Sequence, residues 1–510
     1  MPQADPGHGP PAFEAPDDYA RLRDVLARAQ FADHTIVEAL GVKDVRAVSD
    51  RDVPLLLHAT RRGTPLDTLV RLFLIGVGTD VEATRRAIEP MTLEEWVAAG
   101  LVRVQGSSVV ARVRLLPFQG FLLAYDRTRR DEEGMSPDHV MGIGSSSLTL
   151  ANLTIRRPCE LALDLGTGCG IQAFLAARHS ARVVAADRNP RAVGMAAFNA
   201  RLNGLANVEC LEGDAFEPVQ GRVFGLVVSN PPFVISPDAR YLYRDSGLPT
   251  DQITQKIVRE VPPLLREGGY CQILCNWAHI AGQDWRERLA GWFAGTGCDA
   301  WAMRSETFEA GSYACNWLRH TERDDPKLFL QFFEAWMAYY ERERIEAISG
   351  GLITLRRRSG GRNWFRADDA PDKMLGPAGD AVLQSFELHD FLEAAQADEG
   401  LLRRRLRVSP DVRWEQRLEP TPEGWSLAES ELRLTRGLTY SGRVDPFVAR
   451  LVARCDGERE LGALLEEMAI ALGKDAASVA PACLDIVRRL VERGFLLPAG
   501  AHCRQWAPQP

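Results

Sequence analysis

The feature that most constrains this chain is an apolar run, Leu161–Leu165, which ends in glycines at positions 166, 168 and 170. Such a run is typical of a buried strand, and the segment 171–178 after the glycines is rich in good helix formers. Glycine permits a tight turn and a close approach of the backbone to a ligand at a helix N-terminus. The pattern therefore predicts a strand, a turn and a helix.

A second strand and an acid follow at the spacing of an αβ step. The apolar segment Val183–Ala186 ends at Asp187, which lies 23 residues after Asp164. An acid at this point can hold ribose hydroxyls. Asn189 is expected to cap a helix over 190–203, because a proline follows it and a glycine ends the segment.

The next two strands lead to further candidate ligand-binding residues. Val208–Leu211 is followed by Asp214 and Ala215, so that a loop acid can reach an adenine amine. The apolar run Val227–Ser229 ends in the tetrad Asn230–Phe233, whose sequence is Asn-Pro-Pro-Phe.

The tetrad Asn230, Pro231, Pro232, Phe233 predicts the chemistry. The Asn230 carboxamide oxygen and the backbone carbonyl of Pro231 can accept hydrogen bonds from an NH2 group, and Phe233 offers a face on which a planar group can stack. The target is then an amino group conjugated to a planar system. The alternative is that Asn230 caps a loop and that Phe233 fills the core beneath it.

Together these motifs resemble the class I S-adenosylmethionine-dependent methyltransferases, in particular the N-methylating branch whose fourth strand ends in Asn-Pro-Pro-Phe or Asn-Pro-Pro-Tyr. That branch includes ribosomal-RNA base methyltransferases and release-factor glutamine methyltransferases. The resemblance covers roughly 126–370, about 245 residues. It implies an α/β fold with a Rossmann-like seven-stranded core, S-adenosyl-L-methionine as the cofactor and no metal.

The resemblance also assigns the site. The residues Asp164 to Gly170 would surround the amino acid portion of the cofactor, Asp187 the ribose, and Asp214 with Ala215 the adenine. The expected cofactor-binding residues are Asp164, Gly166, Thr167, Gly168, Gly170, Asp187, Arg188, Asp214, Ala215 and Asn230. The expected catalytic residues are Asn230, Pro231, Pro232 and Phe233.

Segments on both sides of this region predict further domains. Helices over 18–29, 65–76 and 92–99 precede strands over 101–105 and 109–115, which is the order of a winged helix. Thr92 and Glu95 form a capping box. The predicted organisation is a disordered tail over 1–16, a helical, winged-helix-like α+β domain over 17–125, the methyltransferase domain over 126–370 with a helical insertion at about 308–347, and a second winged-helix-like domain over 371–510.

The arginine clusters and one aromatic stripe each allow a functional and a structural interpretation. Arg103, Arg112 and Arg114 can form a substrate platform or take part in packing, and the runs 356–366 and 403–407 can bind phosphate or form solvated faces. The aromatic residues of 329–340 recur at helical spacing, which usually indicates a buried stripe and less often a base-stacking surface.

Composition bounds the setting. The chain has 510 residues and a formal net charge of −8, and it contains no long apolar run and no Cys-x-x-Cys pair. We therefore expect a cytoplasmic enzyme with buried free thiols and no membrane segment. The oligomeric state, monomer or dimer, stays open.

The substrate is expected to be a macromolecule, with RNA favoured over protein or DNA. Phe233 and the arginine clusters favour an adenine or guanine base in ribosomal RNA. The alternatives are a glutamine in a release factor or ribosomal protein, which the stretch Asp245-Ser246-Gly247 favours, an adenine in DNA, and a non-enzymatic DNA-binding regulator that senses S-adenosylmethionine.

Overall fold

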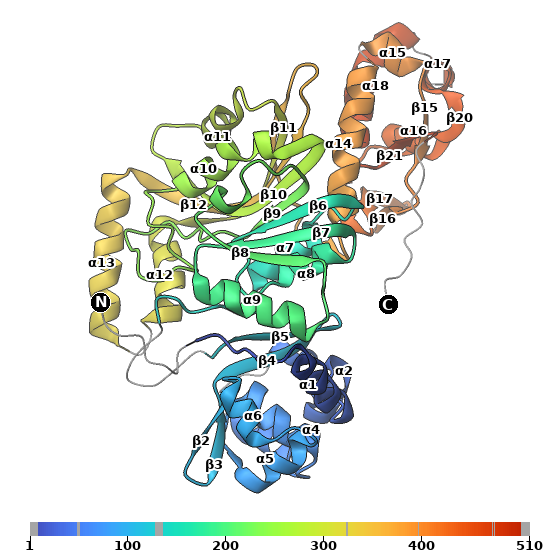
Figure 1. The fold of residues 1–510 in the computed structure, drawn as a ribbon. Helices are drawn as coiled ribbons and strands as arrows, with labels where there is room; N and C mark the ends of the chain where they lie inside the picture. Colours follow the sequence, from blue (N-terminus) through green and yellow to red (C-terminus); the bar gives the residue numbers. More distant parts are fainter. Residues whose placement is uncertain are drawn as a thin grey trace. The chain divides into compact units, whose positions relative to one another are not determined.

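The structure is a computed structural model, and it describes residues 9–47, 52–127, 136–322, 325–395, 397–471, 473 and 475–500 (Figure 1). The chain divides into two compact units. The first comprises the chain up to residue 151 and residues 157–368, and the second comprises residues 152–156 and the chain from residue 369 onward. The two segments predicted as separate domains, 17–125 and 126–370, thus share one unit almost entirely.

The first unit is built on one large sheet. Its strands are β6 (Cys159–Leu165), β7 (Ser180–Asp187), β8 (Val208–Glu212), β9 (Phe224–Ser229), β10 (Leu265–Ile280), β11 (Cys298–Glu309), β12 (Ile345–Arg357) and β13 (Phe365–Asp369). They lie in the order β8-β7-β6-β9-β10-β12-β11-β13 (Figure 1). β6 to β10 pair in parallel, whereas β12 is antiparallel to β10 and β11. The fold is α/β with a large mixed sheet.

The prediction of seven strands was wrong by one, because β13 extends the sheet beyond β11. The backbone N–H of Ala300 in β11 donates to the carbonyl of Trp364 at 2.9 Å, and the ring of Phe365 stacks on Phe293 with centroids 5.1 Å apart. The local sequence is polar and arginine-rich, so its pairing is decided by the edge of β11 and not by an apolar pattern of its own.

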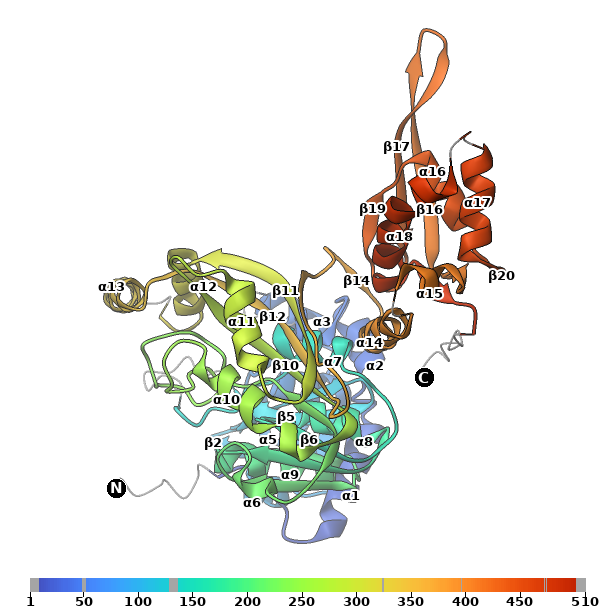
Figure 2. The ribbon, with the colours of Figure 1, turned by 90° about the horizontal axis from the view of Figure 1, so that it is seen from above.

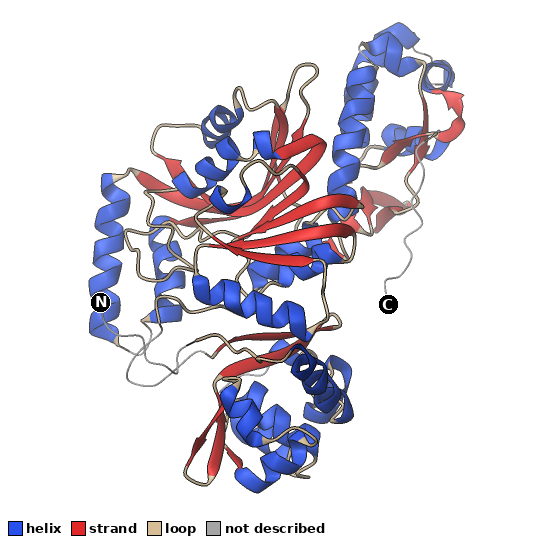
Figure 3. Ribbon diagram, in the orientation of Figure 1, coloured by secondary structure: helices blue, strands red, loops and turns tan. Residues whose placement is uncertain are grey.

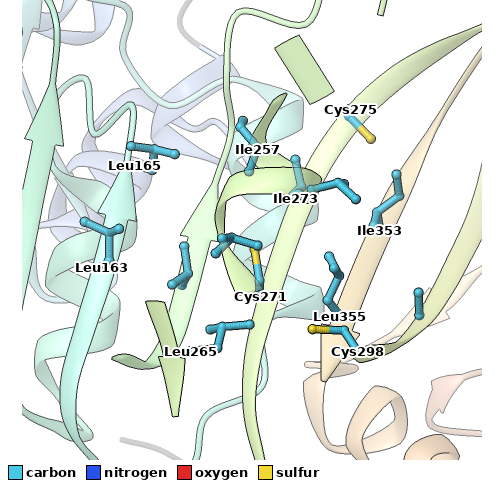
Figure 4. Packing of buried hydrophobic residues seen from close by; sticks show 14 of the residues in the cluster. Leu163, Leu165, Ile257, Leu265, Cys271, Ile273, Cys275, Cys298, Ile353 and Leu355 are labelled. Atoms are coloured by element: carbon cyan, nitrogen blue, oxygen red, sulfur yellow. The ribbon is translucent and has the colours of Figure 1, made fainter. Parts of the chain in front are cut away.

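Helices cover both faces of this sheet (Figure 3). They are α7 (Ser145–Leu153), α8 (Ile171–Ala177), α9 (Pro190–Leu202), α10 (Gln252–Glu260) and α11 (Trp285–Phe293). One core cluster joins strand residues such as Leu163, Ile273 and Ile353, all fully buried, to Ile257 of α10 (Figure 4). Cysteines 271, 275 and 298 lie in this core as free thiols, in agreement with the prediction for Cys271 and Cys275.

The N-terminal part of the unit is mainly helical. Its elements are α1 (Pro16–Arg28), α2 (Asp33–Leu40), η1 (Val45–Ala47), α3 (Val53–Ala59), α4 (Pro65–Val70), η2 (Arg71–Ile75), β1 (Thr79–Asp80), α5 (Val81–Ile88), α6 (Leu93–Ala98), β2 (Val102–Gln105), β3 (Ser108–Ala111), β4 (Val113–Phe118) and β5 (Phe121–Asp126). β1, β3 and β2 form a small antiparallel sheet, and β4 pairs with β5. The predicted capping box at α6 is present, since Glu95 N–H donates to Thr92 Oγ1 at 3.2 Å.

Contacts with α9 join this part to the large sheet's layer of helices. The carboxamide oxygens of Asn199 and Asn203 accept from the backbone N–H groups of Ala124 and Leu122 at 2.7 and 2.8 Å. These bonds anchor β5 to α9.

The tail prediction was wrong for the part that the structure describes. Phe13 is only 8% exposed, because its ring packs against Tyr19 and Phe198, and Ala12 N–H donates to Ala99 O at 3.0 Å. One aromatic side chain in a proline-rich stretch is enough to order it when an aromatic pocket is available. Residues 1–8 of the predicted tail lie outside the described residues.

Two helices, α12 (Ala310–Thr321) and α13 (Pro326–Arg342), lie between β11 and β12. The predicted stripe comprises Phe329, Phe332, Phe333, Trp336 and Tyr340. Trp336 and Tyr340 are at most 1% exposed, and the three phenylalanines are partly buried. Trp336 and Tyr340 form a separate core cluster together with Val234 and Ile235, the residues directly after the tetrad. The insertion therefore packs beneath the segment that leaves β9.

The second unit combines helices with two three-stranded sheets. Its elements are β14 (Met374–Leu375), α14 (Gly379–Ala394), α15 (Asp398–Leu402), β15 (Arg405–Val408), β16 (Val412–Thr421), β17 (Gly424–Leu434), β18 (Gly437–Leu438), β19 (Ser441–Arg443), α16 (Pro446–Arg454), β20 (Asp456–Glu460), α17 (Leu461–Ala471), α18 (Ala476–Glu492) and β21 (Leu496–Pro498). The sheets have the orders β20-β15-β21 and β16-β17-β19. The hairpin of β16 and β17 extends away from the helices of this unit (Figure 2). In the described parts of the chain, no helix has the length and apolar character that crossing a membrane requires.

Candidate active site

A cavity of about 230 Å³ lies at the carboxyl ends of the parallel strands β6 to β9. This edge of a parallel sheet is where ligands bind in such folds, because the strand ends and helix N-termini point there. Of the predicted residues, the cavity is lined by Gly166, Thr167, Gly168, Asp187, Arg188, Asp214, Ala215, Asn230, Pro231, Pro232 and Phe233. Asp164 and Gly170 are absent from the lining, and both support the turn from behind.

The glycine turn needs its glycines for conformation and for space. Gly166, Gly168 and Gly170 all have positive φ, of 76°, 55° and 94°. A Cβ atom on Gly170 would lie 2.4 Å from the ring of Phe174, which is closer than side-chain atoms approach. The turn thus brings a bare backbone to the cavity, as the sequence predicted.

Asp164 holds the turn together. Its Oδ2 accepts from Thr167 Oγ1 at 2.7 Å and from the backbone N–H of Ala173 at 2.9 Å. Its Oδ1 is buried and has no hydrogen-bond partner among the described residues. Burial raises the pKa of Asp164 to about 7. An acceptor of this kind favours a nearby cation or donor.

Asp187 and Arg188 connect the second strand to two different segments. The Asp187 carboxylate accepts from Gly168 N–H at 3.0 Å and from Asn189 N–H at 2.9 Å, and burial raises its pKa. Arg188 also borders the cavity, but its guanidinium donates to the carbonyl oxygens of Asp245 and Ser246 at 3.2 and 3.4 Å. Its observed contacts are therefore with the loop after the tetrad.

Asp214 lies at the other end of the cavity. It forms an ion pair with Lys256 of α10 at 3.0 Å, and 56% of its side chain is exposed. Ala215 beside it has a φ of 47°, which turns the backbone toward the cavity where Ile253 and Ile257 supply an apolar wall.

Asn230 presents a free acceptor. Its Nδ2 donates to Ser146 Oγ at 3.3 Å, while its Oδ1 is buried and lacks a hydrogen-bond partner among the residues that the structure describes. Ser229 Oγ donates to Leu165 O at 2.8 Å, which ties the end of β9 to the end of β6. The substrate motif and the glycine turn are thereby held side by side. A buried acceptor without a partner is costly unless a ligand supplies the donor.

Phe233 has an aromatic neighbour that the sequence reasoning missed. Trp317 of α12 also lines the cavity, and its ring centre lies 6.3 Å from that of Phe233 at an interplanar angle of 72°. Tyr243 and His139 line it as well, with ring centres 5.9 Å apart. No local sequence signal marks Trp317, because only the packing of the insertion brings it to the tetrad.

The insertion fixes the backbone after the tetrad by side-chain hydrogen bonds. Tyr313 Oη accepts from Ile235 N–H at 3.2 Å, and Tyr340 Oη donates to Ile235 O at 2.8 Å. Trp336 Nε1 donates to Asp238 Oδ2 at 2.9 Å, and Tyr339 Oη accepts from Thr250 N–H at 2.7 Å. We call these four side chains the aromatic clamp; it holds both ends of the segment 235–250.

A buried ion pair orders the middle of that segment. Arg244 Nε lies 2.7 Å from Asp245 Oδ1, and the two side chains are 1% and 0% exposed. The Asp245 carboxylate also accepts from the backbone N–H groups of Arg240 and Tyr241 at 3.1 Å. The Asp245-Ser246-Gly247 stretch thus has a structural role in shaping the loop.

Most arginines of the run 356–366 are used within the fold, which argues against the prediction that this run binds phosphate. Arg356 pairs with the buried Asp299 at 2.6 Å, Arg357 donates to the carbonyl of Thr296, and Arg366 pairs with Asp368 at 2.6 Å. Arg114 likewise donates to Leu74 O at 2.7 Å, so it takes part in packing. Sequence alone could not reveal these acidic and carbonyl partners.

Comparison with known proteins identifies the domain that contains this cavity. The profile of the family described as "Methyltransferase small domain" matches residues 134–289, and two profiles described as domains of unknown function, DUF7059 and DUF7782, match 28–112 and 384–498. A putative protein N5-glutamine methyltransferase of Methanocaldococcus jannaschii is 36% identical over 136 residues, which are 25% of this chain and 68% of that protein.

Two further relatives are matched over shorter stretches. The release factor glutamine methyltransferase of Escherichia coli is 39% identical over 84 residues, or 16% of this chain and 30% of that protein. Ribosomal RNA small subunit methyltransferase C of Alcanivorax borkumensis is 33% identical over 114 residues, or 22% of this chain and 31% of that protein. All three relatives are named as methyltransferases.

The chain belongs to the class I S-adenosylmethionine-dependent methyltransferases. It is an enzyme of this class, and its cofactor is S-adenosylmethionine. Residues that line the cavity would hold that cofactor: the bare glycine turn its amino acid portion, the carboxylate of Asp187 its ribose, and the apolar wall beside Asp214 its adenine. When bound there, the cofactor supplies a methyl group on a sulfonium, a good leaving group. Among the described residues, no three His, Cys, Asp or Glu side chains are arranged to hold a metal ion.

Proposed function

We propose that this methyltransferase acts on a planar NH2 group of a macromolecule. The observation that carries the proposal is the Oδ1 atom of Asn230, which is buried in the cavity without a hydrogen-bond partner among the described residues. An NH2 group of a base or carboxamide is a donor of the right kind, and such a group is flat enough to lie against Phe233.

The chain's own residues contribute positioning and polarisation. Asn230 Oδ1 and the carbonyl of Pro231 accept from the two N–H bonds of the substrate and direct its lone pair toward the methyl donor. Phe233 and Trp317 hold the plane of the substrate and exclude water from the transfer line. Holding two reactants in line is the main source of rate in such a reaction. The amine loses its proton to solvent after transfer.

A base in RNA is the first candidate substrate. The cavity presents four aromatic side chains, of Phe233, Trp317, Tyr243 and His139, and stacking on aromatic rings is how proteins hold a base that has left its strand. The relative from Alcanivorax borkumensis is named as a ribosomal RNA methyltransferase.

A glutamine side chain in a protein is the second candidate. Two of the relatives described above are named as glutamine methyltransferases, and Arg356 and Arg366 pair with acids within the fold. A carboxamide NH2 meets Asn230 with the same donor geometry as a base amine.

The flanking segments are proposed to be winged-helix-like platforms. The N-terminal order is helix α4, strand β1, helices α5 and α6, strands β2 and β3, with β3 central in the sheet. The second unit has the order α16, β20, α17, α18, β21, and its central strand β15 comes from upstream in the chain. Both arrangements support the winged-helix reading. Arg103 on β2 is exposed and available to a substrate.

The test is methyl transfer from labelled S-adenosylmethionine to an extract of cells that lack the protein. The product is divided among ribonuclease, deoxyribonuclease and protease, and the label released identifies the substrate class. Asn230→Ala is expected to transfer label about 10²–10³-fold more slowly and to bind the cofactor normally. The reason is that the substrate NH2 group loses one hydrogen-bond acceptor in the transition state. Asn316→Ala, at an exposed asparagine of α12, is the matched control.

Release by ribonuclease would support the RNA base, and release by protease alone would move the assignment to glutamine. Full activity of Asn230→Ala would contradict the proposal, since the unpartnered oxygen would then have no part in the reaction.

A further inference from the structure

The hairpin of β16 and β17 has an apolar face that the rest of its unit leaves open. Trp414 and Leu418 of β16 lie on the same face as Trp425 and Leu427 of β17, because Leu418 is paired with Leu427 and Trp414 with Leu432 in the antiparallel ladder. These four side chains are 44%, 51%, 72% and 41% exposed. A group of large exposed apolar side chains on one face marks an interaction surface.

β16 is also an edge strand. In the order β16-β17-β19, and among the described residues, it pairs only with β17. The ladder has one irregularity, where Arg417 faces Glu429 and Leu418 faces Leu427, so the extra residue lies on β17. β16 therefore alternates regularly between its two faces, and among the described residues its other backbone edge has no strand partner.

The sequence of β16 is complementary to its own reverse. Residues 413–419 read Arg-Trp-Glu-Gln-Arg-Leu-Glu. If two copies pair antiparallel with Gln416 opposite Gln416, opposite charges and apolar partners coincide at every remaining position: Arg413 with Glu419, Trp414 with Leu418, and Glu415 with Arg417. Cross-strand pairs of these kinds stabilise a sheet, and like charges directly opposite destabilise it.

Three of the charged side chains of this edge, Glu415, Arg417 and Glu419, are exposed and only loosely paired within the hairpin. Within the hairpin, Arg417 lies 3.6 Å from Glu419, and Glu415 lies 3.8 Å from Arg433, which are long contacts. The side chains of Glu415, Arg417 and Glu419 are 57%, 66% and 60% exposed. Ion pairs this exposed contribute little, so a second strand can recruit the same groups.

We propose that β16 is a homodimerisation edge. Two copies of the chain join antiparallel about a twofold axis at Gln416, so that the hairpin sheets become one continuous sheet with Trp414 and Leu418 packed across the junction. Pro420 has no N–H group to donate and ends the ladder just beyond the complementary residues. The contact is isologous, because both copies use the same strand edge. The assembly therefore stops at two copies, since neither β16 strand keeps an unpaired edge to which a third copy could bind. The proposal is independent of the methyl-transfer substrate.

The experiment is sedimentation velocity on the full chain over a range of concentrations, with charge reversals on the edge. Glu415→Arg places arginine opposite Arg417 of the second copy, and Arg417→Glu places glutamate opposite Glu415. Each variant alone is expected to weaken the dimer by at least about tenfold, because two attractive pairs per dimer become repulsive. An equimolar mixture of the two variants restores both pairs and is expected to dimerise like the natural chain.

Glu423→Arg is the matched control, since it makes the same change of charge at the exposed turn of the hairpin, outside the strand. It is expected to dimerise normally. Binding of S-adenosylmethionine by each variant shows that the first unit is intact, and circular dichroism reports on the second.

Three results would overturn the proposal. The natural chain can remain monomeric at all concentrations, which excludes the dimer. Both reversals can leave the dimer unchanged, which places it on another surface. The mixture can stay monomeric when each variant is monomeric, which excludes antiparallel pairing centred on Gln416.

Discussion

Replacing Tyr313 by phenylalanine tests how the insertion supports the substrate motif. The Tyr313 hydroxyl is buried and accepts two hydrogen bonds, from Ile235 N–H at 3.2 Å and from Asn276 Nδ2 at 2.7 Å. Tyr313→Phe keeps the aromatic ring but removes the hydroxyl oxygen, which leaves both donors without this acceptor. Each buried donor without a partner costs about 1–3 kcal/mol, so we expect the free energy of unfolding of the first unit to fall by about 2–6 kcal/mol.

Tyr340→Phe is the matched comparison within the same aromatic clamp. Its hydroxyl donates a single hydrogen bond, to Ile235 O at 2.8 Å, and its ring is equally buried. A carbonyl oxygen tolerates loss of one donor better than an N–H group tolerates loss of its acceptor. We therefore expect a loss of about 1 kcal/mol, distinctly smaller than that of Tyr313→Phe.

The measurements are urea unfolding and hydrogen exchange of the peptide that spans 234–250. Faster exchange in this peptide and a lower kcat, with an unchanged affinity for S-adenosylmethionine, are expected for Tyr313→Phe, because the segment begins directly after Phe233. Equal losses in both variants, or no loss in Tyr313→Phe, would refute the view that the clamp holds the loop through its buried hydroxyls.

Three further changes probe the cavity. Burial raises the pKa of Asp164 to about 7, so the folded state binds the proton of this carboxyl group more tightly than the unfolded state does. The protonated Asp164 therefore contributes fully to stability below about pH 4, and this contribution is lost as the pH rises to 7. Asp164→Asn should reduce the dependence of the melting temperature on pH between about pH 4 and 7 in the cofactor-free protein. An unchanged dependence on pH would show that Asp164 does not titrate with a raised pKa. Gly170→Ala places a Cβ atom 2.4 Å from Phe174 at a φ of 94°, so we expect a loss of about 1–3 kcal/mol and weaker cofactor binding by scanning calorimetry. Trp317→Ala should raise the KM of the macromolecular substrate about tenfold and leave the cofactor Kd unchanged, whereas an unaltered KM would remove Trp317 from the substrate wall.

The strand ends and turns of the site were predictable because their determinants are local. The positive φ angles at Gly166, Gly168 and Gly170 demand glycine, and Asn189 caps α9 through its own neighbour, Arg191 N–H, at 3.0 Å. The apolar runs 161–165 and 227–229 are parallel strands buried on both faces, which gives a continuous pattern. Each of these signals needs only a few adjacent residues, so the sequence by itself determined the core of the fold and the location of the cofactor and tetrad motifs.

The partners of those motifs were decided only by the tertiary structure. Ser146 and Asn230 meet across 84 residues of chain, and Trp317 reaches Phe233 because the insertion packs against residues 234 and 235. Arg356, which was a candidate phosphate-binding residue, forms an ion pair with the distant Asp299. Phe13, in a tail that was expected to be disordered, packs against the distant Phe198. The charge or apolar character of a side chain indicates which kind of partner it needs. Which residue becomes that partner depends on the distant segments that the chain brings together, and this is decided only when the whole unit packs.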